Sequence, residues 1–179
     1  MIQKYRNIEP RIDRSCFIAP GSVIIGDVII NRNSSVWYQV VIRGDIAPIE
    51  IGENTNIQDG CILHCKTGIP LRIGNNITVG HGAILHSCTI EDGCLIGMGA
   101  IILDGAKIEK NCLIGAGALV TPKSTFPAGS QVMGNPAVIK RALTSNQISF
   151  FQKSAVHYMD LAGEYKQAEF ESGEFSNPD

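Results

Sequence analysis

The sequence predicts a mainly β protein, a parallel β-helix of hexapeptide repeats with a C-terminal α-helix packed along it. The first observation is a period of six, in which an apolar residue recurs and a small residue follows four places later. The apolar series runs Ile90, Ile96, Ile102, Ile108, Ile114, Val120, Phe126 and Val132. The second is composition, since only 6% of residues are aromatic while 19 are glycine, as suits turn-rich coils. One hexapeptide cannot bury its apolar face alone, so the coils must stack around a continuous core.

The β-helix is expected to span residues 1–143, with residues 1–15 covering the first coil. The period of six extends backward from Ile90, although Leu85 precedes Ile90 by five residues instead of six. After an interruption the same period continues backward from Leu63 to Ile51. This pattern resembles the left-handed hexapeptide β-helix family, in which three hexapeptides make a triangular coil of about 18 residues. The left hand rests on that resemblance, because crossovers between parallel strands are usually right-handed. At 179 residues the chain is long enough for one such core and too short for two ordinary domains.

A helix is expected over residues 144–167. Thr144 or Ser145 can serve as its N-cap. The apolar residues beyond them have the spacing of a helix that lies on a surface, and they are Ile148, Phe151, Ala155, Tyr158 or Met159, and Ala162. Residues 168–179 are rich in glutamate and are expected to form a loosely ordered acidic tail.

Three of the four histidines fall inside the repeat at positions that can be counted. His64 follows Leu63 and His86 follows Leu85, a separation of one coil plus a four-residue excess in the loop 65–70. Their backbones should therefore stack about 4.8 Å apart on one face. His81 takes the third place of the preceding hexapeptide, on another face, so it cannot easily join the other two within one chain, whereas a homotrimer would bring it to His64 and His86 of a neighbour. Three neutral imidazoles with an open fourth position are the ligand set of a catalytic zinc.

The residues around these histidines resemble the γ-class carbonic anhydrases and their close homologues. The resemblance covers the chain from about Cys16 to Leu143 and is more specific than the hexapeptides alone. It is carried by Arg43-Gly44-Asp45, Asn56-Ile57-Gln58-Asp59-Gly60, Leu63-His64, Val79-Gly80-His81-Gly82, Leu85-His86 and Ile96-Gly97-Met98-Gly99. It implies a lyase that hydrates carbon dioxide reversibly to bicarbonate at a trimer interface. The ligand type makes zinc the default metal, with iron and cobalt as alternatives.

The same resemblance implies roles for four further residues, and the apolar stripe of the helix adds Tyr158. Arg43 and Asp45 would join subunits and order the site, although an ordinary surface ion pair is the plainer interpretation. Gln58 would orient a metal-bound water, and Asp59 would brace the interface. Counting along the repeat places Gln58 on the same face as His81. Tyr158 is expected mainly to pack the helix, with an approach to the metal site as a second interpretation.

The expected chemistry is attack of a metal-bound hydroxide on carbon dioxide, since metal binding lowers the pKa of water from about 15.7 to about 7. The archetypal enzymes of this class shuttle the proton with a glutamate directly after the aspartate and with an acidic residue on a long loop. Here Ile46 follows Asp45, and the loop 65–70 carries no carboxylate. Glu50 or Glu53 could substitute, although the spacing places neither near the metal.

Two other functions stay open. One is a catalytically weak or silent metal-binding trimer, and the other is a hexapeptide acyltransferase or thioesterase acting on coenzyme A esters. The net charge of −2 with scattered lysine and arginine argues against nucleic acid or membrane surfaces as partners, and a cytoplasmic location is expected. The sequence contains no CxxC motif, so a metal site made of cysteine thiolates is not expected. Four cysteines take the small fifth place of their hexapeptides, while Cys65 and Cys88 lie beside the histidines.

Overall fold

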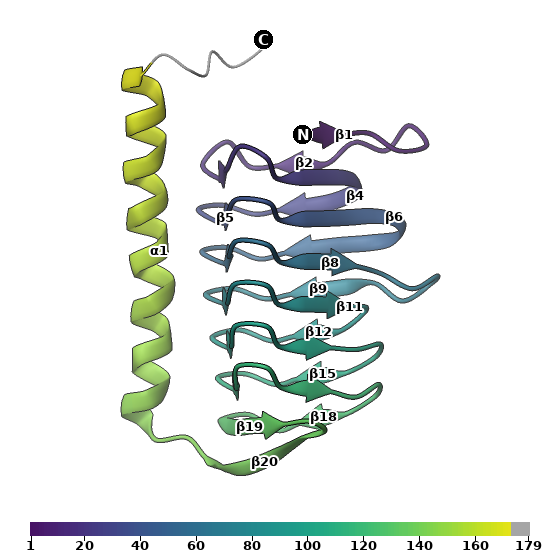
Figure 1. Ribbon diagram of the computed structural model, residues 1–179, viewed down its shortest axis with the longest axis vertical. Coiled ribbons are helices and arrows are strands. Elements are labelled where there is room, and N and C mark those ends of the chain that lie inside the picture. Colours follow the sequence, from purple (N-terminus) through teal and green to yellow (C-terminus); the bar gives the residue numbers. More distant parts are fainter. Residues whose placement is uncertain (173–179) are drawn as a thin grey trace.

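The chain coils into a triangular prism with one long helix along its side (Figure 1). This computed structural model describes residues 1–172. Parallel pairing joins the strands of successive coils, as the period of six requires, and among the strands of these residues only the last one of the prism pairs antiparallel with the strand before it. The predicted left-handed β-helix with a C-terminal helix is confirmed.

Three faces make up the prism. The histidine face contains β1 (Ile2–Gln3), the first halves of β4 (Val23–Ile30) and β6 (Val41–Ile51), β8 (Ile62–His64), β11 (Ile84–His86), β14 (Ile101–Ile102) and β17 (Leu119–Val120). The polar face contains β2 (Arg11–Ile12), the second halves of β4 and β6, β9 (Leu71–Ile73), β12 (Thr89–Ile90), β15 (Lys107–Ile108) and β18 (Thr125–Phe126). The helix face contains β3 (Phe17–Ile18), β5 (Ser35–Val36), β7 (Asn56–Ile57), β10 (Thr78–Val79), β13 (Leu95–Ile96), β16 (Leu113–Ile114), β19 (Ser130–Gly134) and β20 (Ala137–Ala142).

The apolar residues of the repeat stack in register inside the prism. Leu63 pairs with Leu85, Leu85 with Ile102, and Ile102 with Val120, and all four are fully buried. Burial of one such side chain stabilises the fold by roughly 1.5–3 kcal/mol. Stacking in register therefore fixes which residues of each coil face outward.

Helix α1 (Ser145–Ser172) lies along the helix face. The Thr144 hydroxyl accepts a hydrogen bond from Gln147 N at 3.3 Å, and Gln147 Oε1 accepts one from Thr144 N at 3.1 Å, which is a capping box. The predicted apolar stripe faces the prism, with Phe151, Ala155 and Ala162 buried. An aromatic cluster of Phe17, Trp37, Tyr38, Tyr158 and Tyr165 joins the two.

The predicted helix end at residue 167 was wrong, because α1 continues to Ser172. Glutamate and alanine in this segment favour helix, and the next glycine after residue 167 is Gly173. Residues 168–172 are thus helical, and the rest of the expected acidic tail lies outside the described residues. No helix within residues 1–172 is long and apolar enough to cross a membrane.

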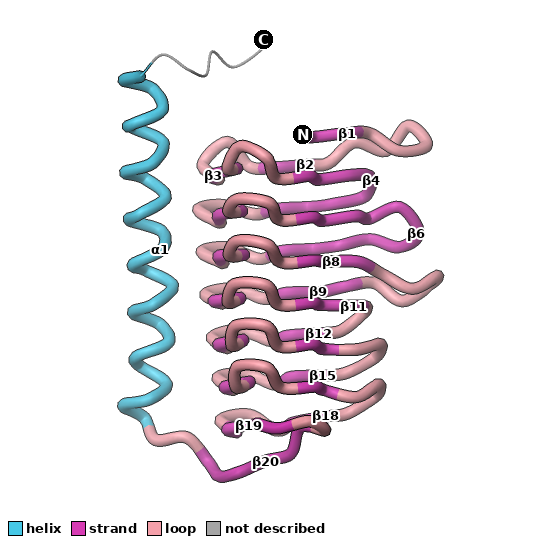
Figure 2. The backbone as a smooth tube through the Cα atoms, in the orientation of Figure 1, coloured by secondary structure: helices cyan, strands magenta, loops and turns pink. Residues whose placement is uncertain are grey.

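Three excursions from the repeat project from one corner of the prism (Figure 2). They are the turn 5–8, the bend 45–48 within β6, and the loop 65–70, closed by a bridge between Lys66 and Ile69. The first two line one cavity, and the thiol of Cys65 contacts the Pro48 carbonyl at 3.5 Å. This corner directly follows the ends of the strands that carry the histidines.

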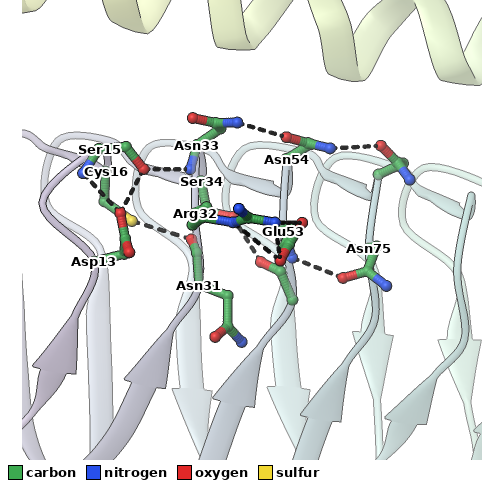
Figure 3. A network of polar contacts seen from close by, with 12 residues as sticks. Asp13, Ser15, Cys16, Asn31, Arg32, Asn33, Ser34, Glu53, Asn54 and Asn75 are labelled. Atoms are coloured by element: carbon green, nitrogen blue, oxygen red, sulfur yellow. Dashed lines mark hydrogen bonds and ion pairs between the residues drawn. The ribbon is translucent and has the colours of Figure 1, made fainter.

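Side-chain ladders stabilise a second corner, between the polar and helix faces (Figure 3). Asn33 Nδ2 donates to Asn54 Oδ1 at 3.2 Å, and Asn54 Nδ2 donates to Asn76 Oδ1 at 3.1 Å. All three asparagines have positive φ, a conformation that asparagine tolerates better than most residues. In the same corner Glu53 forms an ion pair with Arg32 at 3.0 Å.

Candidate metal centre

His64 and His86 form an outward-facing pair at the ends of β8 and β11. The alternation of each strand buries Leu63 and Leu85 and turns the following histidines outward. The two histidines are direct register partners, and His64 Nδ1 lies 3.2 Å from His86 Nε2. The predicted stacking of the two imidazoles is confirmed.

A carboxylate contacts the other ring nitrogen of each histidine. Asp45 Oδ1 lies 3.0 Å from His64 Nε2, and Asp104 Oδ1 is hydrogen bonded to His86 Nδ1. Such contacts place the ring protons on the nitrogens that face the carboxylates. The two nitrogens that face each other are then free to donate their lone pairs to a metal.

Asp104 was not predicted from the sequence, although the repeat shows where it should lie. Leu85 pairs with Ile102 across the shortened coil, so Asp104 lies just beyond the end of the strand that stacks on His86. Lys66 from the neighbouring loop lies on its other side, with Nζ 3.6 Å from Asp104 Oδ2. Leu85 and Ile102 are 17 residues apart, so the same count places Leu103 level with His86 and Asp104 one residue beyond it.

Charge pairing keeps both carboxyl groups ionised. Burial raises the pKa of Asp45, but hydrogen bonds from Arg43 and His64 outweigh it and the pKa is lowered. The hydrogen bond from His86 lowers the pKa of Asp104 against a smaller effect of burial. Arg43 thus acts on His64 through Asp45 within one chain, and its role between subunits stays a prediction.

The histidine pair fits two ligands of a tetrahedral metal. Zinc–nitrogen bonds of about 2.0–2.1 Å at tetrahedral angles separate two ligand nitrogens by about 3.3–3.4 Å. The facing nitrogens of His64 and His86 are 3.2 Å apart. No group of three histidine, cysteine, aspartate or glutamate side chains in the described part of the chain could hold a metal. Within residues 1–172 the chain thus supplies two such ligands at this position, His64 and His86.

His81 occupies a different corner, where β10 leaves the helix face. Its Nδ1 lies 2.8 Å from Asp59 Oδ2, and its backbone N–H donates to Gln58 Oε1 at 3.2 Å. The prediction that Gln58 and His81 share a face is confirmed. The His81 side chain is 45% exposed, so it is open to a neighbouring molecule.

Tyr158 of α1 packs against the helix face. Its ring meets Trp37 edge-on, with centroids 5.6 Å apart. Burial raises the pKa of Tyr158, and the charge of Asp59 raises it further. Helix packing is thus confirmed as its main structural role, and it lies within electrostatic reach of Asp59.

An apolar column runs along the histidine face beside His64 and His86. Its members face outward and are aligned by strand pairing, and they are Val41, Ile62, Ile84, Ile101 and Leu119. Ile62 is 45% exposed. A contiguous apolar patch next to an incomplete ligand set is typical of a subunit contact.

Neither of the suggested substitute shuttle residues lies at the histidine corner. Glu50 is on the polar face, opposite Arg72, and Glu53 is paired with Arg32 in the corner drawn in Figure 3. The acidic residues that do contact the histidines are Asp45, Asp59 and Asp104. The suggestion of Glu50 or Glu53 was wrong, because the turn between faces carries them away.

All six cysteines are buried free thiols. Burial raises the pKa of Cys65 to about 11, and it raises the pKa of Cys88 as well. Both side chains point into the core while the neighbouring histidines point outward. The cysteines therefore offer no thiolate to the histidine pair.

Comparison with known proteins agrees with this architecture. The family model described as bacterial transferase hexapeptide (six repeats) matches residues 9–44 and 87–122. The chain is 43% identical over 166 residues to the carbonic anhydrase of Geobacillus kaustophilus, covering 93% of this chain and 91% of that protein. It is 45% identical over 159 residues to gamma carbonic anhydrase 1, mitochondrial, of Arabidopsis thaliana, covering 86% of this chain but only 58% of the longer plant protein. A crystal structure of a hexapeptide transferase family protein from Anaplasma phagocytophilum superposes with a TM-score of 0.89 at 40% identity, covering 92% of this chain and 97% of that one.

Proposed function

This chain belongs to the γ-carbonic anhydrase family, and on that premise we propose that it catalyses the reversible hydration of carbon dioxide to bicarbonate. The observation that carries the proposal is the His64–His86 pair, with facing nitrogens 3.2 Å apart and a carboxylate behind each ring. Zinc suits this donor set best, and ferrous iron or cobalt also suits imidazole. Bound there, the metal would supply a nucleophilic hydroxide at neutral pH.

The working unit in this proposal is a homotrimer. His64 and His86 of one subunit would complete the site with His81 of the next, as the exposure of His81 and the incomplete set within one chain favour. The apolar column around Ile62 would pack against the neighbour and exclude water. Arg43 and Asp59 lie at the edges of the two half-sites and would brace the contact.

The residues of the chain would divide the work of the reaction. Asp45 and Asp104 hold the protons on the outer nitrogens of His64 and His86, which keeps both rings in the ligand tautomer. Gln58 would donate from its amide to an oxygen of the reacting group. Tyr158 and Asp59 would shape the same wall of the site.

We expect proton release to limit turnover. Ile46 and the loop 65–70 place no carboxylate at the positions where the archetypal enzymes of this class carry theirs. The proton must then leave to buffer, so we expect turnover to rise with buffer concentration. A chain that binds metal and hydrates carbon dioxide slowly would still agree with the proposed site.

The test is stopped-flow hydration by protein purified without oxygen, with metal per chain measured on the same sample and zinc or ferrous iron reloaded. We expect metal-dependent hydration that is lost in His64→Ala. One metal per chain without hydration would instead identify a silent metal-binding trimer. The similarity to a hexapeptide transferase family protein calls for a parallel assay of thiol release from acetyl coenzyme A, and metal-independent release would favour acyl transfer.

A further inference from the structure

A row of polar side chains connects helix α1 to His81 across the helix face. Ser154 of α1 is hydrogen bonded to Thr78 of β10 at 3.3 Å, and Thr78 Oγ1 accepts from Asn56 Nδ2 at 3.0 Å. Asn56 Oδ1 accepts from Gln58 Nε2 at 3.1 Å, and Gln58 Oε1 accepts from the His81 backbone at 3.2 Å. The row links an element near the end of the chain to the corner that displays the third histidine.

Two backbone groups of fixed polarity set the orientation of both amides in the row. The His81 backbone N–H can only donate, so Gln58 must turn its oxygen toward His81 and its nitrogen toward Asn56. Asn56 Nδ2 also donates to the Ile77 carbonyl at 3.3 Å, a group that can only accept. Both amide orientations are thus determined, and the Thr78 hydroxyl, which accepts from Asn56, donates to Ser154.

The row is buried, which makes each of its bonds costly to lose. Asn56 is 1% exposed, and Thr78 and Gln58 are 5% exposed. On α1, Ser154 lies between the buried Phe151 and Ala155 on the face that packs against the prism. Packing alone would be served by another alanine, and buried polar groups are tolerated only where they are satisfied.

We propose that Thr78 and Ser154 are positioning residues that act through Asn56 on Gln58. Asn56 Oδ1 accepts from Gln58 Nε2 and Gln58 Oε1 accepts from the His81 backbone, so the position of Asn56 sets where the Gln58 amide lies beside His81. Without the hydroxyl of Thr78, Asn56 loses an acceptor and the amide pair loses its anchor on the helix. Helix α1 is in this way part of the site, and the catalytic consequence rests on the proposed function.

The decisive variants are Thr78→Val, which keeps the shape and removes the hydroxyl, and Thr78→Ser, which restores it. Thr89→Val is the matched control, since Thr89 is a partly buried strand threonine on the polar face. We expect Thr78→Val to lower kcat/KM for hydration about five- to tenfold, as loss of one buried hydrogen bond predicts, with metal content unchanged. Thr78→Ser should recover most of this loss, and Ser154→Ala should show a smaller decrease.

A second measurement does not need activity. Side-chain amide signals of Asn56 and Gln58 in ¹⁵N-labelled protein should shift or broaden in Thr78→Val and stay in place in Thr89→Val. If wild-type protein fails to hydrate carbon dioxide, the proposed function fails while the amide signals still test the row. Unchanged amide signals in Thr78→Val, or equal losses in Thr78→Val and Thr78→Ser, would overturn the inference. Should Thr78→Val not fold, the same readouts on Ser154→Ala decide.

Discussion

Removal of the Asp104 carboxylate should weaken metal binding without dismantling the protein. Asp104 holds the proton of His86 on Nδ1, so in Asp104→Ala the ring is free to carry that proton on Nε2, the nitrogen that faces His64. Loss of such a partner typically costs 10- to 100-fold in metal affinity, about 1.4–2.7 kcal/mol. The side chain is 27% exposed, so water can partly replace it and the effect should lie near tenfold.

The assay is a competition titration of metal-free protein with zinc against a chelator of known affinity. Light scattering and circular dichroism on the same samples should show unchanged assembly and fold. Asp104→Asn keeps an acceptor oxygen and loses the charge, so its affinity should fall between the wild type and Asp104→Ala. Lys66→Ala removes only the exposed partner at 3.6 Å and should change the affinity by less than about threefold. Wild-type affinity in Asp104→Ala, together with complete loss in His86→Ala, would refute this account of the carboxylate.

Three further predictions test the contact, the proton path and the pH dependence. Ile62→Glu should convert a trimer into monomers in light scattering, because it places charges in the apolar column, whereas Ile2→Glu, an equally exposed isoleucine on β1, should not. Ile46→Glu introduces a carboxylate beside Asp45, at a side chain that is already 45% exposed. At low buffer concentration this variant should raise kcat several-fold and leave kcat/KM unchanged. A constant kcat would show that proton transfer is not limiting. The pKa of Asp45 is lowered in the folded chain, so the stability it contributes is complete above its ordinary value of about 3.9 and is lost as the pH falls through the lowered value. Urea unfolding of metal-free protein between about pH 6 and pH 3 should therefore show a steeper decline for the wild type than for Asp45→Asn, and parallel curves would contradict this.

The repeat, the register and the stacking of the two histidines could all be predicted from the sequence. A coil of about 18 residues with a constant rise converts residue number into position once the excess of the loop 65–70 is subtracted, so the separation of Leu63 and Leu85 was enough to place His64 over His86. The same arithmetic placed Gln58 with His81 and separated His81 from the other two. Such counting works because each coil contacts only its neighbours.

The side chains around those positions depend on the tertiary structure. Asp104 reaches back to His86 from the turn beyond β14, and Ser154 reaches Thr78 across 76 residues of chain because α1 docks on the helix face at one particular rotation. The register of a helix against a sheet depends on how its side chains pack, and the period of six carries no information about that packing. The Asp104 carboxylate and the hydroxyls of Thr78 and Ser154 could therefore not be predicted from the sequence, while the histidines could be placed by counting.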